Sequence, residues 1–333
     1  MLDTFKKYIF APAIALALAA LASMASSCDR HKPTDSSTSG ITTLICDATI
    51  QNIISQEVDV FEFTYPKASI MTWYTDEHSA IDSLVTMKSS LIITARQLTD
   101  KQKEYLKTQN RNVRTQQIAV DAIAIIVNTA NNIDELSIGE LREIMTGKAQ
   151  RWDDVFPSKL GKIQVVFDHA GSSTVKYVTD SILRGEKFTD EVYACQNSQE
   201  VFKEVEKRKN SIGVIGVSWI TADLESADTD RRTMQQKVAD LQKNDTSAID
   251  FTNRIKVLKI RRDNCPIAYK PYQLYIYEGN YPLYRSIYVT TTAPNGSLAH
   301  GFYSFLTGFI GQKIILGTGV MPAVVHPRMV SLE

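Results

Sequence analysis

Short apolar runs alternate with amphipathic stretches along the chain from Ile41 onward. The apolar runs have the length and β-branched content of buried strands, and the stretches between them repeat apolar residues at helical spacing. The predicted strands are 41–46, 68–74, 90–95, 113–128, 162–167, 211–220, 255–260 and 281–292. The predicted helices are 49–66, 79–88, 99–110, 137–147, 198–210 and 296–319, the last divided near 308–311. Strands that alternate with helices predict an α/β fold with mainly parallel sheets.

One charged, weakly helical stretch, residues 221–253, interrupts this alternation. We interpret it as a surface excursion, with a functional unit as the alternative.

Gly171, Ser172, Ser173 and Thr174 connect the strand ending at Phe167 to a stretch with helical spacing. One interpretation is a capped helix, because serine at 172 is a good N-cap and glycine eases the turn. The other is an anion site, because a helix start presents unpaired N–H donors and a positive dipole end. This loop alone leaves both open.

The N-terminus has the pattern of a secretory signal: two lysines, an alanine- and leucine-rich run, and small residues. The small residues end at Cys28, and "ASSC" resembles a bacterial lipobox, although Ala25 replaces the usual leucine. We therefore predict a signal peptide over 1–27, lipid (palmitate) on Cys28, and a polar tether over 28–40. An uncleaved anchor, for which the apolar core is short, and simple secretion are the alternatives.

Composition narrows the class of protein. The 333 residues are 44% hydrophobic and 22% charged, enough for a sizeable core in one large or two ordinary domains. Lysine plus arginine equals aspartate plus glutamate at 37 each, which argues against a nucleic-acid partner.

Cysteine and histidine spacing indicates no metal site. Besides Cys28, the chain has Cys46, Cys195 and Cys265. A Cys195–Cys265 disulfide is the favoured pairing in an oxidising compartment, and three buried thiols are the equal alternative.

Nothing indicates an enzyme or a cofactor. The chain lacks a Gly-x-Ser-x-Gly elbow, and His169 near Ser172 is more typical of hydrogen-bond donors than of a nucleophile with its base. We predict a protein that is not an enzyme.

Five stretches together resemble the substrate-binding proteins of bacterial phosphate ABC transporters, the PstS type. They are "DAIAIIVNTANNIDELSIGELREIMTGKAQRWDDV", "AGSSTVKYV", "SIGVIGVSWI", "NYPLYRSIYV" and "GQKIILGTGVMPA". The resemblance covers about 41–323 and implies a two-lobed type II periplasmic-binding fold, with ligand in a cleft between lobes joined by extended hinges. It places the first lobe at 41–118 and 284–333 and the second at 119–283.

The same resemblance implies a set of ligand-binding residues. The second anion loop is Gly171 to Thr174, and the first is "CDATI", with the Thr49 hydroxyl and the Ile50 N–H as donors. At the third loop Ser79 fits the pattern and His78 is a substitute donor, and "TAR" adds Thr94 and Arg96 as candidates.

Two departures affect this site. Asp168 stands where the family usually has arginine, and Ala170 stands where it often has an acid. Arg96 or a protonated His169 would be the replacement for the missing cation.

The resemblance thus implies a lipid-anchored receptor on the periplasmic or cell-surface side of a bacterial membrane. It would bind inorganic phosphate and deliver it to an ABC permease and ATPase complex. Choosing phosphate over sulfate needs an acceptor for the phosphate proton. The candidates are Asp168, Asp47, Asp76 and Glu77, with Asp168 alternatively a surface acid. A receptor for another oxyanion, or a degenerate site with a sensing or adhesion role, is the alternative function.

Overall fold

The computed structural model describes residues 35–224 and 255–324. These residues belong to a unit that starts at Asp35. The predicted signal peptide, Cys28, the start of the tether, most of the charged excursion and the residues after 324 lie outside the described residues.

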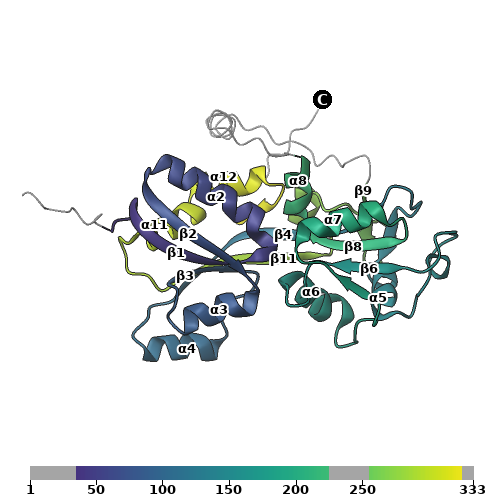
Figure 1. Cartoon of the computed structure of the whole chain (residues 1–333), viewed down its shortest axis with the longest axis horizontal. Coiled ribbons are helices and arrows are strands. Elements are labelled where there is room, and N and C mark those ends of the chain that lie inside the picture. Colours follow the sequence, from purple (N-terminus) through teal and green to yellow (C-terminus); the bar gives the residue numbers. More distant parts are fainter. Residues whose placement is uncertain (1–34, 225–254, 325–333) are drawn as a thin grey trace, which may run out of the picture. The chain divides into compact units, whose positions relative to one another are not determined.

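A mixed sheet in the order β2-β1-β3-β11-β4-β8-β6-β7 forms the framework, and β9 and β12 pair with β4 (Figure 1). Its strands are β1 Ser39–Asp47, β2 Lys67–Thr75, β3 Leu91–Thr94, β4 Arg114–Asn128, β6 Gln164–Phe167, β7 Val192–Ala194, β8 Ser211–Gly216, β9 Ile255–Val257, β11 Tyr284–Thr291 and β12 Met321–Pro322. Two further strands, β5 Glu135–Ser137 and β10 Lys259–Arg261, pair with each other in parallel. Strands pair in parallel toward both ends of the sheet and antiparallel in its middle. The predicted α/β class is confirmed.

The long strand β4 belongs to two parts of the sheet. Its residues 114–122 pair with β11, and residues 123–128 pair with β8 or β9. This division places the ends of β8 and β11 beside the middle of β4.

Most helices form where the apolar spacing predicts them, whereas the helix at Gln273–Tyr277 forms where it predicts none. The helices are α2 Gln51–Thr64, α3 Glu77–Val85, α4 Asp100–Thr108, α5 Ile138–Thr146, α6 Ser173–Tyr177, α7 Ser198–Lys207, α8 Val217–Leu224, α10 Gln273–Tyr277, α11 Leu298–Thr307 and α12 Phe309–Gly317, with the short 3-10 helices η1 Ala48–Ile50 and η2 Trp152–Asp154 and the π-helix η3 Val178–Leu183. Ser137 forms a capping box with Glu140 at the start of α5, and Gly147 ends that helix in the left-handed region at φ 75°.

Two predicted strands are wrong in part. The strand predicted over 255–260 is divided into β9, which pairs with β4, and β10, which pairs with β5. The strand predicted over 211–220 ends at Gly216, and α8 begins at Val217. Residues 211–220 are buried throughout, so their apolar run carries no alternation that would mark the change from strand to helix.

Two main hydrophobic clusters lie on the two parts of the sheet. The first core runs from Leu44 to Ala119 and from Ile287 to Val320, and the second core runs from Val120 to Leu283. A small third cluster includes Ile81, Leu98 and Leu106. The lobe boundaries read from the sequence stay a prediction.

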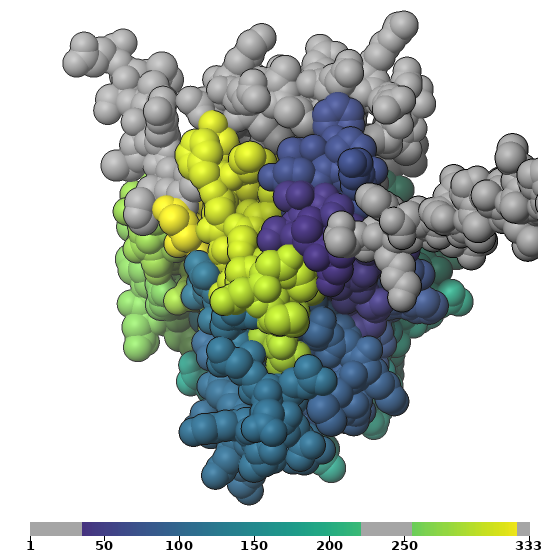
Figure 2. Space-filling view, turned by 90° about the vertical axis from the view of Figure 1, so that its left-hand side faces the viewer, coloured from purple at the N-terminus to yellow at the C-terminus, as the bar shows by residue number. Residues whose placement is uncertain are grey.

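The start of the described chain packs beside a late helix. The Leu298 N–H donates to Asp35 Oδ1 at 3.0 Å, and a β-carbon at Gly301 would lie 1.9 Å from the Ser37 carbonyl oxygen. Figure 2 shows the purple beginning of β1 against the yellow-green segment that contains α11. Only glycine at 301 permits this close approach.

Cys46, Cys195 and Cys265 are free thiols. The favoured Cys195–Cys265 disulfide is therefore wrong. Cys46 and Cys195 are buried as small apolar side chains and Cys265 is half-buried. Among the described helices, none has the length and apolar character needed to cross a membrane.

Candidate functional site

A buried arginine–aspartate pair joins β11 to β4. Arg285 and Asp121 stand directly opposite each other in the antiparallel register. Nε and one terminal nitrogen of Arg285 donate to Asp121 Oδ2 at 3.2 and 2.9 Å, and the side chains are 3% and 0% exposed. Burial acts to lower the pKa of Arg285, but the carboxylates of Asp121 and Asp47 outweigh it and raise that pKa. The guanidinium is therefore a fixed positive charge inside the protein.

Gly216 makes room for this pair at the end of β8. A β-carbon at 216 would lie 2.7 Å from Asp121 Oδ2 and 3.4 Å from a terminal nitrogen of Arg285. Burial raises the pKa of Asp121, while Arg285 and backbone N–H groups at the start of α8 act in the opposite direction. A side chain at 216 would displace the carboxylate from the arginine.

The second loop supplies a hydroxyl to the same arginine. The other terminal nitrogen of Arg285 donates to Ser173 Oγ at 2.6 Å. Ser172 caps α6 by accepting from the Val175 N–H at 3.1 Å. Ser172 and Ser173 are buried, as is Thr174, whereas Gly171 is exposed. The structure thus combines the two interpretations of this loop: it caps a helix, and it lines a polar cluster.

The first loop meets the second loop directly. Thr49 Oγ1 and Ser173 Oγ are 2.8 Å apart, although 124 residues separate them in the chain. Asp47 holds the first loop in shape because its Oδ1 accepts from the Thr49 N–H at 3.0 Å. A line of hydrogen bonds therefore runs from Asp121 through Arg285 and Ser173 to Thr49. The side chain of Ile50 is buried in the first core.

The candidates on the third loop and β3 make other contacts. His78 and Ser79 are exposed, and the Ser79 N–H and hydroxyl donate to Asp76 at 2.9 and 2.6 Å. The Thr94 hydroxyl donates to the Arg96 carbonyl oxygen at 2.8 Å.

Arg96 forms an ion pair with Glu77, with Arg96 Nε and Glu77 Oε2 2.9 Å apart. The Arg96 side chain is 34% exposed, in contrast to the fully enclosed Arg285. The buried cation of the site is therefore Arg285.

Asp168 lies inside the protein, so its interpretation as a surface acid is wrong. Its Oδ1 accepts from the Ser172 hydroxyl and, at 3.0 Å, from the His169 N–H, and its Oδ2 accepts from Ser198 Oγ at 3.4 Å. Burial raises the pKa of Asp168, and the hydrogen bonds from Ser172 and from the His169 N–H act in the opposite direction together with the charge on Arg285. His169 is half-buried beside the loop.

Several buried oxygens of this cluster have no hydrogen-bond partner. They are Asp47 Oδ2, Glu77 Oε1 and the Thr174 hydroxyl. Burial and the nearby Asp47 carboxylate raise the pKa of Glu77, against the effect of Arg96 and Arg285. Leaving such groups unpaired costs about 1–3 kcal/mol each. The set contains acceptors that need donors and a hydroxyl that needs a partner, which suits a small ligand carrying both.

A family profile described as a PBP superfamily domain matches residues 32–308. The chain belongs to this superfamily. A "Phosphate-binding protein PstS" of Staphylococcus aureus (strain bovine RF122 / ET3-1) is 26% identical over 199 residues, 59% of this chain and 51% of that protein. The chain thus spans about half the length of this curated relative.

Solved structures share the fold. A putative phosphate ABC transporter substrate-binding protein with bound phosphate from Clostridium perfringens has a TM-score of 0.66 at 17% identity, covering 85% of this chain and 100% of that one. An ABC-type phosphate transport receptor from Vibrio cholerae has a TM-score of 0.59 at 17% identity, with coverage of 85% and 100%. The chain is thus PstS-like in sequence and in fold.

Sequence reasoning missed Arg285 and Asp121 as members of the cluster. Both lie within stretches that carry the family resemblance, but the set of ligand-binding residues that it implies includes neither. A usable signal existed: Asp121 is the one charged residue in the otherwise apolar run 118–127. A lone acid inside a buried strand needs a cation or hydrogen-bond donors on a neighbouring segment if it is to stay charged.

Proposed function

We propose that this chain is an extracytoplasmic solute-binding protein that captures inorganic phosphate between its first and second loops and delivers it to an ABC permease with its ATPase. The observation that carries the proposal is the set of unpaired buried oxygens on Asp47, Glu77 and Thr174. The two carboxylates of this set interact electrostatically with the Arg285 guanidinium. Phosphate at neutral pH presents both a hydroxyl donor and anionic acceptor oxygens. It therefore matches a cluster that lacks both kinds of partner.

Binding replaces contacts within the cluster with contacts to the ligand. The Thr174 hydroxyl donates to a phosphate oxygen, and the Ser173 and Thr49 hydroxyls exchange their mutual bond for bonds to phosphate. Arg285 supplies the positive charge. The Ile50 N–H in the first loop, and residues Gly171 and Ser172 in the second, supply further contacts to phosphate. Burying an oxyanion costs several kcal/mol. Each hydrogen bond to it returns about 1.5–3 kcal/mol, so a few such donors suffice.

Asp47 is the acceptor that would distinguish phosphate from sulfate. Its Oδ1 is used by the Thr49 N–H, and its Oδ2 is free to accept the proton that phosphate carries and sulfate lacks. The buried carboxylates around Arg285 outnumber it, and their negative charge favours a protonated anion over a fully ionised one.

Calorimetric titration of the chain from residue 29 onward with phosphate, arsenate and sulfate tests the proposal. We expect heat with phosphate and arsenate and none with sulfate. Asp47→Asn keeps an oxygen to cap the Thr49 N–H but replaces the acceptor with a donor. Phosphate should therefore bind about tenfold or more weakly, as expected for one charged hydrogen bond, and sulfate should gain affinity. Asp82→Asn, at an exposed position of α3, is the matched control and should bind as the unaltered chain does.

One observation favours a second candidate, a PstS-like protein with a sensing or adhesion role and no anion ligand. Thr49 and Ser173 already satisfy each other, and the Arg285 nitrogens already bond Asp121 and Ser173. Absence of heat with all three anions would favour this candidate over transport.

The proposal also includes the lipid anchor on Cys28 and the two lobes with phosphate in the cleft between them. The signal-like N-terminus supports the anchor, and the division of apolar residues into a first and a second core supports the lobes.

A further inference from the structure

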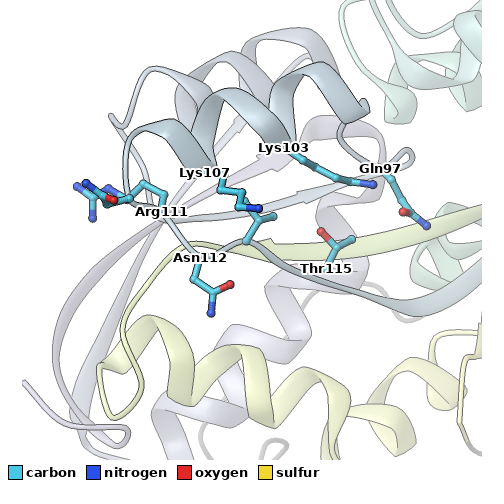
Figure 3. A pocket seen from close by; sticks show the side chains of 8 residues that line it. Gln97, Lys103, Lys107, Arg111, Asn112 and Thr115 are labelled. Carbon is cyan, nitrogen blue, oxygen red and sulfur yellow. The ribbon is translucent and has the colours of Figure 1, made fainter.

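A groove of about 640 Å³ lies along α4 and the start of β4, lined by residues that the phosphate cluster does not use. The lining residues are Gln97, Lys103, Lys107, Asn110, Arg111, Asn112, Val113 and Thr115. Figure 3 shows the Lys103 and Lys107 side chains extending over the groove toward Gln97 and Thr115, while Arg111 points away at the far end.

The residues that line this groove are cationic or neutral and polar, with one exception. Three of the eight residues are cations, of which Lys103 and Lys107 extend over the groove (Figure 3), three are amides, and none is a carboxylate. The whole chain has equal numbers of acidic and basic residues, so a lining without acids departs from its average surface. Its only aliphatic residue is Val113, so it offers no apolar anchor for an acyl chain or a protein partner.

Lys103 and Lys107 form a like-charged pair on one face of α4. Residues four apart on a helix are neighbours, and two equal charges there repel each other. The ion pair of Lys103 is a 3.5 Å contact to Asp100, a fully exposed side chain on the same helix. An anion held between the two ammonium groups would remove this repulsion.

The size of the groove favours an anion larger than a single phosphate group. It falls within the range of sites for ligands of roughly drug size, about 300–1,000 Å³, and is much larger than one phosphate group. Amide, hydroxyl and ammonium donors distributed along its length suit a ligand with several anionic oxygens.

We propose that this groove is a second anion site, which binds a small soluble polyanion carrying two or more phosphate groups. It is separate from the cluster around Arg285 and does not depend on the function proposed for that cluster.

The experiment titrates the full-length chain, in a neutral detergent and at low salt, with tripolyphosphate. Orthophosphate is present at one fixed concentration, just sufficient to saturate the cluster around Arg285, so that this cluster does not contribute and the ionic strength stays low. The test variant is Lys103→Gln with Lys107→Gln, which keeps helix propensity. The control is Lys88→Gln with Lys101→Gln, which removes the same net charge from exposed positions outside the groove. We expect tripolyphosphate to bind the unaltered chain and the control alike, and to bind the test variant about tenfold or more weakly because two charged contacts are lost.

Three results would overturn the inference. Equal loss in both variants would indicate non-specific charge attraction. Absence of tripolyphosphate binding to the unaltered chain would remove the site. Binding of phosphatidylglycerol vesicles through Lys103 and Lys107, without binding of tripolyphosphate, would assign the groove to a membrane surface.

Discussion

Thr174 buries a hydroxyl that has no hydrogen-bond partner. A group of this kind destabilises the folded chain unless a ligand completes it. The Thr174 hydroxyl therefore lowers the stability of the free protein and raises its affinity for ligand. A substitution at this residue can separate the two effects.

Thr174→Val should leave the free energy of unfolding unchanged or raise it, because it removes an unpaired polar group worth about 1–3 kcal/mol. The same change should weaken phosphate binding about tenfold. Denaturant unfolding without phosphate and calorimetry with phosphate measure the two effects.

Thr291→Val is the control for Thr174→Val. The Thr291 hydroxyl donates to the Ser90 carbonyl oxygen at 2.8 Å and accepts from the Ala293 N–H at 3.1 Å. Its loss should lower stability by about 1 kcal/mol and leave phosphate affinity unchanged. Phosphate affinity that survives Thr174→Val would contradict the role given to that hydroxyl.

Only part of the candidate site was predictable from the sequence. Thr49 and the loop from Ser172 to Thr174 carry a local pattern, small hydroxyl residues at a helix start, that indicates their chemistry. Arg285 and Asp121 carry no local pattern, because their pairing depends on the register of two strands far apart in the chain. Such a register is set by tertiary packing.

The helices α2 and α8 are joined by a group of hydrogen bonds between the first and second cores. Trp219 Nε1 donates to the Thr49 carbonyl oxygen at 2.6 Å. Ser218 Oγ donates to Asn52 Oδ1 at 3.2 Å, and Asn52 Nδ2 donates to the Ser218 carbonyl oxygen. These contacts fix the first loop, so they should affect how long phosphate stays bound.

Trp219→Phe removes one N–H and keeps an aromatic ring. We expect phosphate to dissociate about fivefold faster, equivalent to about 1 kcal/mol, with a smaller change in the association rate. Stopped-flow measurement of both rates tests this. Trp152→Phe is the matched control, because Trp152 Nε1 makes an equivalent 2.9 Å bond to the Asn210 carbonyl oxygen, far along the chain from Thr49. Equal acceleration in both variants would indicate a general loosening of the protein.

Glu57 places a carboxyl in the buried face of α2, where neither oxygen has a hydrogen-bond partner. Burial raises its pKa well above the ordinary value of 4.5. The folded chain then holds a proton at pH values where the unfolded chain has lost it. Stability therefore falls as pH rises from the ordinary value through the raised one.

Glu57→Met should reduce this fall and raise stability at neutral pH by about 1–3 kcal/mol, because an unpaired buried polar group is replaced by an apolar one. Urea unfolding across a pH series measures the slope. Glu104→Gln, at an exposed position of α4, should leave the slope unchanged. A slope that persists in Glu57→Met would assign the pH dependence to other buried acids such as Asp121 and Asp168.

Apolar spacing in the sequence predicts most of the individual helices and strands, including the division of α11 from α12 near Gly308. It does not predict the start of α8. Every residue there is buried, so the apolar run shows neither the spacing of a strand nor that of a helix.

Across the whole molecule, membership of the PBP superfamily agrees with the alternating pattern of strands and helices. The pattern did not indicate that one strand, β4, would pair with elements of both cores. That arrangement arises only when distant strands come together.

The proposed attachment to a membrane concerns the whole molecule as well. Cys28→Ser should move the protein from the membrane fraction to the soluble fraction and abolish labelling by radioactive palmitate. Fractionation of cells that make each form tests this, with Cys46→Ser as the control. Unchanged membrane retention in Cys28→Ser would indicate an uncleaved anchor.

The strand β4, which both cores share, limits how such proteins can be divided and recombined by engineering. A gene fragment cut to encode only one core would divide a continuous strand and leave its backbone groups without neighbours. The two halves are therefore poor candidates for exchange as modules, and chimeras with other superfamily members should succeed best when β4 and β11 come from the same parent.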